Sequence, residues 1–346
     1  MDKRPVRLKD IAARLNISTA TVSLALSNHP RIPIETRRKV EAMASMLGYQ
    51  RNPLVSQLAA NRWQSIKDHP RTVIAFIWLD KLKRSINHPW SGVIKGIEAE
   101  AHIRGYQVQL FNLFDYPSSA ALDRILYSRG IQGIIVGRIY DKTPRLNLQW
   151  TRYAAICCGS SVYRFPLHGV APNHFTVIEK TWARLRSLGY RRIGVVLVNI
   201  SHRLQDDDLR MGAVMAELQH LKPDEIVPPL FIQGAQVESI PEWYSRHRPD
   251  AVIGMNSSVW EILTRVGGWN CPGDFAFANL HLQENDQQSG IVDMDTRLGQ
   301  SAIQLLVTQL SLNLRGTSPL PMWHELEPEW VERGTCPPVV NRKKYR

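Results

Sequence analysis

The chain has 346 residues, of which 44% are hydrophobic, and it carries 43 lysines and arginines against 31 aspartates and glutamates. This apolar content supports large buried cores and excludes a disordered tail. The formal net charge of +12 suggests a polyanionic partner, most simply nucleic acid. A diffuse charge that keeps the protein in solution would give the same total, so composition leaves both explanations open.

Basic residues are concentrated near the N-terminus. Residues 1–71 hold 13 lysines and arginines and 5 aspartates and glutamates, which is two thirds of the excess in one fifth of the chain. This distribution indicates a basic N-terminal module joined to a nearly neutral body.

Signals for export or membrane insertion are expected to be absent. The N-terminus leads into no apolar segment, and no apolar run approaches the roughly 20 residues that span a bilayer. The four cysteines form no CxxC pair. We therefore expect a cytoplasmic protein with reduced thiols, in which Cys157 and Cys158 lie at the end of a buried strand.

The spacing of apolar residues predicts a helix-turn-helix near the N-terminus. One apolar face of a short helix within residues 7–15 is formed by Leu8, Ile11, Ala12 and Leu15. Asn16 tolerates the left-handed conformation of a tight turn, and Ser18 suits the N-cap of a second helix over residues 19–27. Two short helices joined by such a turn are typical of DNA-binding modules.

Two further helices are predicted before the body of the protein. A third helix begins near Pro33 and is ended by Gly48. Asn52 and Pro53 then provide an N-cap and a first helical residue for a short helix over residues 54–60. Its apolar side chains have no obvious protein core to join.

From Arg71 onward, apolar strands alternate with helices, and this rhythm predicts two doubly wound parallel sheets. Strands are expected at 72–78, 106–113, 133–137, 154–158, 192–198, 230–232, 251–254 and 275–278. Helices are expected at 90–104, 118–128, 175–188 and 206–221.

The motifs of the first 60 residues follow one another at regular spacing. They are Leu8-Lys9-Asp10-Ile11-Ala12, Ile17-Ser18-Thr19-Ala20-Thr21-Val22-Ser23, Thr36-Arg37, Leu47-Gly48-Tyr49, Asn52-Pro53-Leu54 and Leu58. Together they resemble the headpiece of the LacI/GalR (lactose-repressor) family of transcriptional regulators. More weakly, residues 71–332 resemble the family's effector domain, which is similar to periplasmic sugar-binding proteins, most of all at 188–193, 249–252 and 271–275.

The resemblance implies a domain organisation. An all-α helix-turn-helix headpiece would occupy residues 1–50, and a hinge helix with a linker would occupy 51–70. Residues 71–340 would form an α/β, periplasmic-binding-protein-like body of two doubly wound parallel-sheet lobes. In such a body the chain crosses between the lobes three times, here expected near 159–162, 282–291 and 317–321.

The resemblance also assigns DNA contacts. Thr19 and Ala20 fall where the family reads bases in the major groove, and Leu58 falls where a hinge leucine enters the minor groove and kinks the duplex. The full set that we expect to contact DNA is Leu8, Ser18, Thr19, Ala20, Thr21, Ser23, Leu24, Ser27, Arg31, Thr36, Tyr49, Asn52 and Leu58.

Leu24 departs from the family's pattern. Many members place an arginine there, and a bidentate arginine–guanine pair contributes about 1–3 kcal/mol of base discrimination. A leucine offers only an apolar contact, for example to a thymine methyl group, so we expect an operator half-site that differs at that base. The alternative role of Leu24 is packing against the third helix.

The effector-binding positions depart further. Family aspartates or arginines are replaced by Asn173, Leu209, Ser257 and His281. Loss of this many polar groups predicts an atypical effector or none. The candidates that remain are Trp78, Trp90, His174, Arg210, Asn256 and His281. For Trp78, Trp90 and His281, core packing or plain surface exposure is the alternative role.

The sequence contains no catalytic motif, so we expect no enzyme activity, no cofactor and no metal site. Asp206, Asp207 and Asp208 can bind a cation, but the start of a helix is the more ordinary place for such residues. The resemblance implies a homodimeric, nucleoid-associated repressor that binds a palindromic operator and responds to a small-molecule effector, with a sugar as the candidate class. The alternatives are a sugar-sensing protein with a vestigial headpiece and, less well supported, an α/β enzyme.

Overall fold

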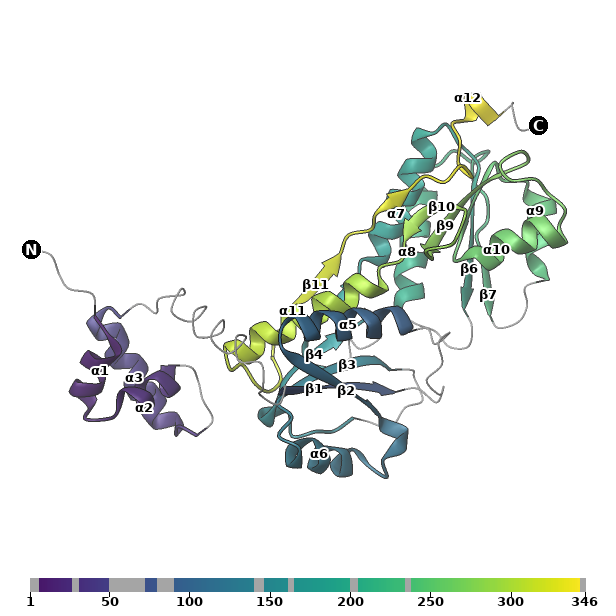
Figure 1. The fold of residues 1–346 in the computed structure, drawn as a ribbon. Helices are drawn as coiled ribbons and strands as arrows, with labels where there is room; N and C mark the ends of the chain where they lie inside the picture. Colours follow the sequence, from purple (N-terminus) through teal and green to yellow (C-terminus); the bar gives the residue numbers. More distant parts are fainter. Residues whose placement is uncertain are drawn as a thin grey trace, which may run out of the picture.

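The computed structural model describes residues 6–26, 31–49, 72–79, 90–139, 146–160, 165–199, 205–233 and 238–342. The N-terminal part is a bundle of three helices, α1 (Leu8–Leu15), α2 (Thr19–Leu26) and α3 (Ile34–Leu47) (Figure 1). Ile11, Val22 and Val40, one from each helix, are fully buried together. The predicted helix-turn-helix and third helix are therefore confirmed.

The turns of this bundle follow the local chemistry of the sequence. Asn16 ends α1 in the left-handed conformation, with φ of 52°, and Gly48 ends α3 with φ of 68°. Glycine has no Cβ to clash in this region, and asparagine tolerates it better than most residues. Both residues were predicted as turn residues from the sequence.

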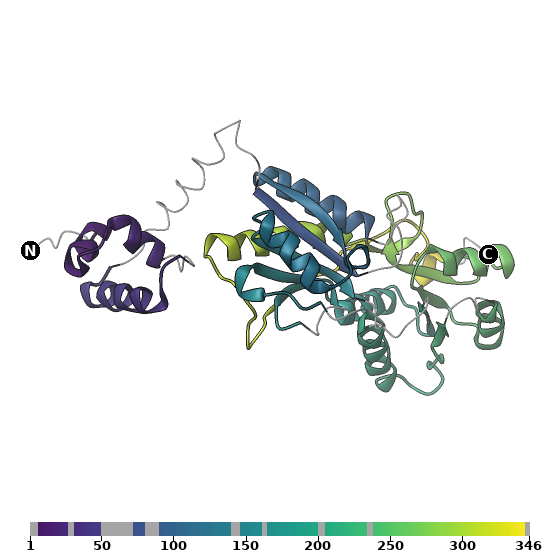
Figure 2. The same cartoon turned by 90° about the horizontal axis from the view of Figure 1, so that it is seen from below.

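The body contains two six-stranded sheets with helices on both faces (Figures 1 and 2). In the first lobe the strand order is β11-β5-β4-β3-β1-β2, and every pairing is parallel. Its strands are β1 (Thr72–Leu79), β2 (Tyr106–Asn112), β3 (Gly133–Ile139), β4 (Ala154–Cys158), β5 (His168–Pro172) and β11 (Trp323–Leu326). Its helices are α5 (Ser91–Ile103), the 3₁₀ turn η1 (Leu113–Asp115), α6 (Ser119–Ser128), the 3₁₀ turn η2 (Trp150–Arg152) and α11 (Asp295–Ser311).

The second lobe repeats this design in the order β12-β10-β9-β8-β6-β7. Its strands are β6 (Ile193–Asn199), β7 (Leu230–Gln233), β8 (Ala251–Gly254), β9 (Ala276–Leu282), β10 (Ser289–Val292) and β12 (Trp330–Val331). Its helices are α7 (His174–Ser187), α8 (Gln205–Gln219), α9 (Ser239–His247) and α10 (Ser257–Glu261), which continues as the π-helical turn η4 (Ile262–Val266); α12 (Val339–Arg342) follows near the C-terminus. Only the edge pair β10–β12 is antiparallel among these described strands.

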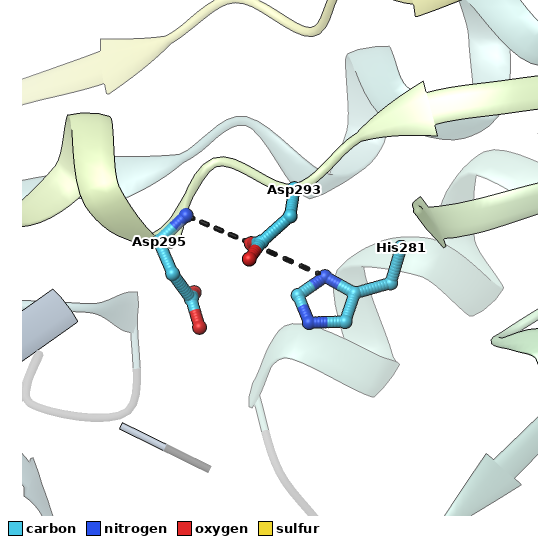
Figure 3. Close-up of side chains that lie close together, drawn as sticks. All are labelled: His281, Asp293 and Asp295. Atoms are coloured by element: carbon cyan, nitrogen blue, oxygen red, sulfur yellow. Dashed lines mark hydrogen bonds and ion pairs between the residues drawn. The ribbon is translucent and has the colours of Figure 1, made fainter. Parts of the chain in front are cut away.

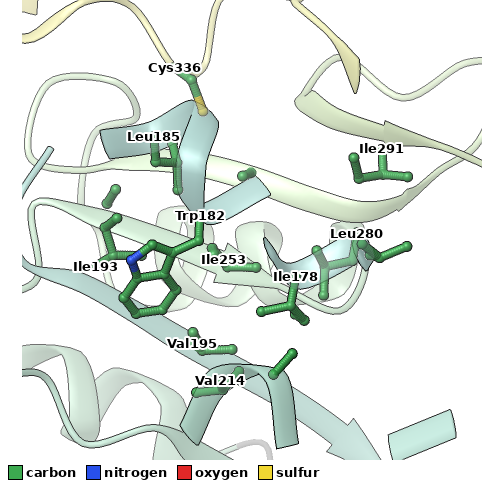
Figure 4. Packing of buried hydrophobic residues seen from close by; sticks show 14 of the residues in the cluster. Ile178, Trp182, Leu185, Ile193, Val195, Val214, Ile253, Leu280, Ile291 and Cys336 are labelled. Carbon is green, nitrogen blue, oxygen red and sulfur yellow. The ribbon is translucent and has the colours of Figure 1, made fainter. Parts of the chain in front are cut away.

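Burial alternates along the strands, as expected for sheets covered on both faces. In β1, Ile74 and Phe76 pack with α5 and α11, whereas Ala75 and Ile77 pack with α6 on the opposite face. In the second lobe, Trp182 of α7 is 1% exposed and lies over the sheet among aliphatic side chains of the strands (Figure 4). The predicted doubly wound α/β body is confirmed.

All three crossings between the lobes lie later in the chain than predicted, the second by only a few residues. The chain leaves the first sheet after β5 and enters α7 at His174, leaves the second sheet after β10 and enters α11 at Asp295, and returns between β11 and β12. The first crossing is later than expected because β5, which contains His168, Gly169 and Pro172, pairs with β4 and β11. A strand of this composition is stabilised by its neighbours rather than by its own propensity.

Helices α5 and α11 approach closely because glycines lie between them. A Cβ atom added to Gly96 would lie 2.1 Å from the Thr296 carbonyl oxygen, and one added to Gly299 would lie 2.2 Å from the Val93 carbonyl oxygen. In both cases the added Cβ would clash with a backbone carbonyl oxygen, so movement of a side chain cannot relieve the contact.

We expect Gly299→Ala to destabilise the body by several kcal/mol, because either the two helices must separate or the contact must be accommodated by strain. Gly212→Ala is the matched control, since Gly212 is also inside a helix but has no atom within 4 Å of the added Cβ. There the higher helix propensity of alanine should raise stability by up to about 1 kcal/mol. Urea unfolding of both variants measures the contrast, and equal midpoints would contradict it.

None of the helices within the described ranges combines the length and apolar character needed to cross a membrane.

Candidate DNA interface and effector site

The start of α2 is built by a serine cap. Ser18 Oγ accepts a hydrogen bond from the Thr21 backbone N–H at 2.9 Å and lies 2.8 Å from Thr21 Oγ1. Ser18, Thr19 and Ala20 are exposed, and α2 itself contains no acidic residue. Exposed amides and hydroxyls at a helix N-terminus favour an anion, and side chains there are short enough to approach base edges.

The other described members of the expected DNA-contacting set differ in exposure. Ser23 and Arg31 are exposed, and Thr21 and Thr36 are half-buried. Leu8, Leu24 and Tyr49 are half-buried and pack against the headpiece core. For Leu24, the packing role is therefore seen directly, and its half-buried side chain retains some exposed surface. Ser27, Asn52 and Leu58 lie outside the described residues.

The effector candidates of the second lobe include a buried charged cluster, which we call the His174–Arg210 cluster. The His174 side chain at the start of α7 is 8% exposed, and that of Arg210 in α8 is 10% exposed. Arg210 Nη2 lies 2.9 Å from His174 Nδ1, and Arg210 Nη1 lies 3.0 Å from Asp207 Oδ1. The cluster also includes Asp206, whose Oδ2 lies 3.6 Å from His174 Nε2.

The direction of the Arg210–His174 hydrogen bond determines which nitrogen of the His174 ring carries the proton. A guanidinium can only donate hydrogen bonds, so His174 Nδ1 must accept from Arg210, and the ring proton is then on Nε2. That proton lies on the side of Asp206, although 3.6 Å is too long for a hydrogen bond. Asp206, Asp207 and Asp208 do occupy the first turn of α8, as predicted, and Asp207 also forms an ion pair with Arg210.

The two tryptophan candidates belong to the core of the first lobe. Trp78 and Trp90 are 8% and 7% exposed. Their rings lie 6.4 Å and 5.9 Å from the ring of Phe76, centre to centre. Gly159 leaves room for Trp90, because a Cβ atom there would lie 3.3 Å from the indole.

The remaining candidates lie at the carboxyl ends of β8 and β9. Asn256 caps α10 by accepting a hydrogen bond from the Ser258 backbone N–H at 3.0 Å. His281 Nδ1 lies 3.6 Å from Asp293 Oδ1. Between these strands, the fully buried Asn279 donates to Ser257 Oγ at 3.1 Å, so Ser257 belongs to a hydrogen-bonded network of the lobe.

Four of the six candidates, Trp78, His174, Asn256 and His281, thus lie at or just after the carboxyl ends of parallel strands, the edge at which α/β sheets bind ligands. Trp90 and Arg210 belong to the helices that follow β1 and β6 in the chain. Asp293, which follows β10, and Asp295, which begins α11, lie beside His281 but were not predicted as members of this site. Their Asp-x-Asp spacing was visible in the sequence, but nothing local indicated that His281 lies beside them.

Cys157 and Cys158 are buried at the end of β4, as predicted, and all four cysteines are reduced rather than joined in disulfides. Burial raises the pKa of the Cys157 thiol far above its ordinary value, which disfavours the reactive thiolate.

Comparisons with known proteins agree with this architecture. Residues 7–52 match the family model of bacterial regulatory proteins of the lacI family. Residues 75–265 match the model of periplasmic binding proteins and the sugar binding domain of the LacI family.

Curated relatives match over parts of the chain. The NTD biosynthesis operon regulator NtdR of Bacillus subtilis (strain 168) is 25% identical over 190 residues, 54% of each chain. The HTH-type transcriptional repressor CytR of Escherichia coli (strain K12) is 33% identical over 102 residues, 29% of this chain and 26% of the relative. The chain spans about half, or less, of the length of the curated relatives that it matches.

Solved structures share the fold. The lac repressor dimer bound to operator and an anti-inducer has a TM-score of 0.55 at 18% identity, covering 96% of this chain and 100% of that chain. The complex of the transcriptional regulator CelR with cellobiose has a TM-score of 0.56 at 17% identity, with the same coverage. With both of its parts matched by family models, the chain belongs to the LacI/GalR family of bacterial regulatory proteins.

Proposed function

We propose that the protein is a sequence-specific DNA-binding transcriptional repressor that binds a palindromic operator as a homodimer. The observation that carries this proposal is the exposed Ser18–Ala20 start of α2 on a basic, independently cored helix-turn-helix. Exposed residues at the start of the second helix are those that such modules place in the major groove. Residues 1–50, 51–70 and 71–340 are proposed as headpiece, hinge with linker, and effector-binding and dimerisation body.

Within this proposal, Thr19 and Ala20 read bases, while Ser23, Arg31 and Thr36 contact phosphates. Leu58 of the hinge, outside the described residues, is the side chain that enters the minor groove. The dimer is supported by the operator-bound lac repressor dimer, whose fold the chain shares. Two-fold symmetry of the protein matches a palindromic site.

The effector is proposed to be a small polar molecule bound at the carboxyl ends of the strands, of which sugars are the first class to test. Support comes from the family model of the sugar binding domain and from the structural likeness to the CelR–cellobiose complex. His174, Arg210, Asn256 and His281 are the polar contacts proposed on this side. A change in the angle between the lobes would then alter the hinge and with it DNA affinity.

A sugar-sensing protein with a vestigial headpiece is the alternative. The headpiece argues against it, because α1, α2 and α3 retain a common buried core and both left-handed turn residues. A module without a DNA-binding role would have no need for an exposed, polar start of α2.

Arg31→Gln tests the DNA proposal on an operator selected by the full-length protein from a random DNA library. If Arg31 contacts one phosphate, the slope of log affinity against log salt concentration should fall by about 0.9, with a similar loss of affinity on all sequences. Arg246→Gln is the matched control, because Arg246 is an exposed arginine of the second lobe paired with Glu242. An unchanged slope for Arg31→Gln would remove this phosphate contact, and failure to select any DNA would overturn the proposed function.

A further inference from the structure

One group of side chains outside the His174–Arg210 cluster combines a histidine with two carboxylates. His281 near the end of β9, Asp293 after β10 and Asp295 at the start of α11 each offer one ligand atom, and these atoms lie within 4.8 Å of one another. The three side chains converge on one space (Figure 3). They come from three different elements, although nothing in the sequence brings His281 next to the aspartates.

The donor set suits a divalent metal ion. An imidazole nitrogen with carboxylate oxygens is a common set for Zn²⁺ and its first-row neighbours. Bonds of about 2.0–2.2 Å in a tetrahedral site place donor atoms roughly 3.4 Å apart. His281 Nδ1 and Asp293 Oδ1 are 3.6 Å apart, close to this spacing, and one ligand atom from each of the three residues lies within 4.8 Å of the others.

The cluster of His281, Asp293 and Asp295 is accessible to solvent, yet its side chains are held in place. The side chains of His281 and Asp293 are 41% and 20% exposed, so an ion can enter from solvent. Asp293 Oδ1 accepts a hydrogen bond from the Asp295 backbone N–H at 2.8 Å, which fixes the carboxylate relative to α11. Gln283 Nε2 lies 3.4 Å from Asp293 Oδ2 and adds an outer contact of the type that orients metal ligands.

The same cluster lies where the chain passes from one lobe to the other. β9 belongs to the second sheet, whereas α11 packs on the first. Gly92 of α5, also in the first lobe, lies against the cluster, because a Cβ atom there would be 2.7 Å from Asp295 Cβ and 3.7 Å from Asp293 Oδ2. An ion held by all three side chains would therefore join a strand of the second lobe to the helices of the first.

We propose that His281, Asp293 and Asp295 bind one divalent transition-metal ion at this crossing, in contrast to the absence of a metal site expected from the sequence. Three protein ligands leave at least one coordination position for water or for an oxygen atom of a bound molecule. The proposal concerns ion binding and does not depend on the proposed DNA-binding function.

The test uses the full-length, tag-free chain after treatment with a chelator. Titration with Co²⁺, followed by its visible absorption, should show one equivalent bound with nitrogen and oxygen ligands, and Zn²⁺ should displace it. Thermal unfolding should shift to higher temperature as Zn²⁺ is added, because the ion binds the folded state.

Three variants assign the site. His281→Asn, Asp293→Asn and Asp295→Asn should each weaken Co²⁺ binding by at least about 10–100-fold. Asn at position 293 retains an oxygen that accepts the hydrogen bond from the Asp295 amide, so the start of α11 is preserved in that variant. His324→Asn and Glu284→Gln, at exposed positions outside the cluster, are the matched controls and should bind as the parent does.

Absence of Co²⁺ and Zn²⁺ binding below millimolar concentration would overturn the proposal. Binding that all three cluster variants leave unchanged would overturn it equally, since the ion would then be held elsewhere. Circular dichroism of each variant establishes that a loss of binding is measured on folded protein.

Discussion

Ile11→Ala is expected to abolish most operator binding while leaving the body of the protein folded. Ile11 is fully buried among Val22, Val40 and the other core residues of the headpiece. Removing an isoleucine side chain from such a core costs about 2–5 kcal/mol. A three-helix module this small has a total stability of about the same size, so much of the headpiece would be unfolded at equilibrium.

Ile34→Ala is the matched control for this substitution. Ile34 is the first residue of α3 and is 60% exposed, so the same truncation removes little buried surface there. Operator affinity, measured by fluorescence anisotropy, should fall by about tenfold or more for Ile11→Ala and change little for Ile34→Ala. Equal effects of the two variants would show that the headpiece does not depend on this core.

Arg210→Met is expected to destabilise the body by about 3–5 kcal/mol. The substitution removes the cation from a cluster in which Asp206 and Asp207 side chains are only 3% and 16% exposed. Breaking a buried ion pair from one side leaves a carboxylate with neither water nor its counter-ion, and this is much more costly than losing the attraction itself. Urea unfolding of the full chain, followed in the body by tryptophan fluorescence, measures the effect.

Arg246→Met provides the comparison. Arg246 pairs with Glu242 at 2.9 Å, close to the 3.0 Å of the Arg210–Asp207 pair, but both partners are largely exposed. Exposed pairs of this kind contribute about 0.3–0.5 kcal/mol. The double variant Arg210→Met with Asp207→Asn should regain part of the lost stability, because the uncompensated charge is removed. A small effect of Arg210→Met alone would contradict the buried-charge account.

The headpiece was predictable because its signals are local. The apolar residues of α1 recur at helical spacing, and Asn16, Ser18 and Gly48 are the residue types that turns and caps require. Each signal acts within four or five residues, so the tertiary structure had little left to decide there.

The body was predicted only where the sequence is strongly apolar. β1 and β6 are nearly continuous apolar runs, typical of strands buried on both faces. β5 and β10, by contrast, contain polar residues and glycine and were not predicted. α11 was not predicted, although its buried residues Leu298, Ala302 and Leu306 follow helical spacing.

By itself, the sequence determined the basic helix-turn-helix, the α/β rhythm of the body and the first-turn position of the aspartates of α8. The tertiary structure decided which distant residues meet. His174 and Arg210 are 36 positions apart and become hydrogen-bonded because α7 and α8 pack together, and His281 reaches Asp293 because β9 and β10 pair. Local patterns fix helices and turns through interactions within a few residues, whereas sites at the ends of parallel strands depend on strand order and crossings, which no short window of sequence contains.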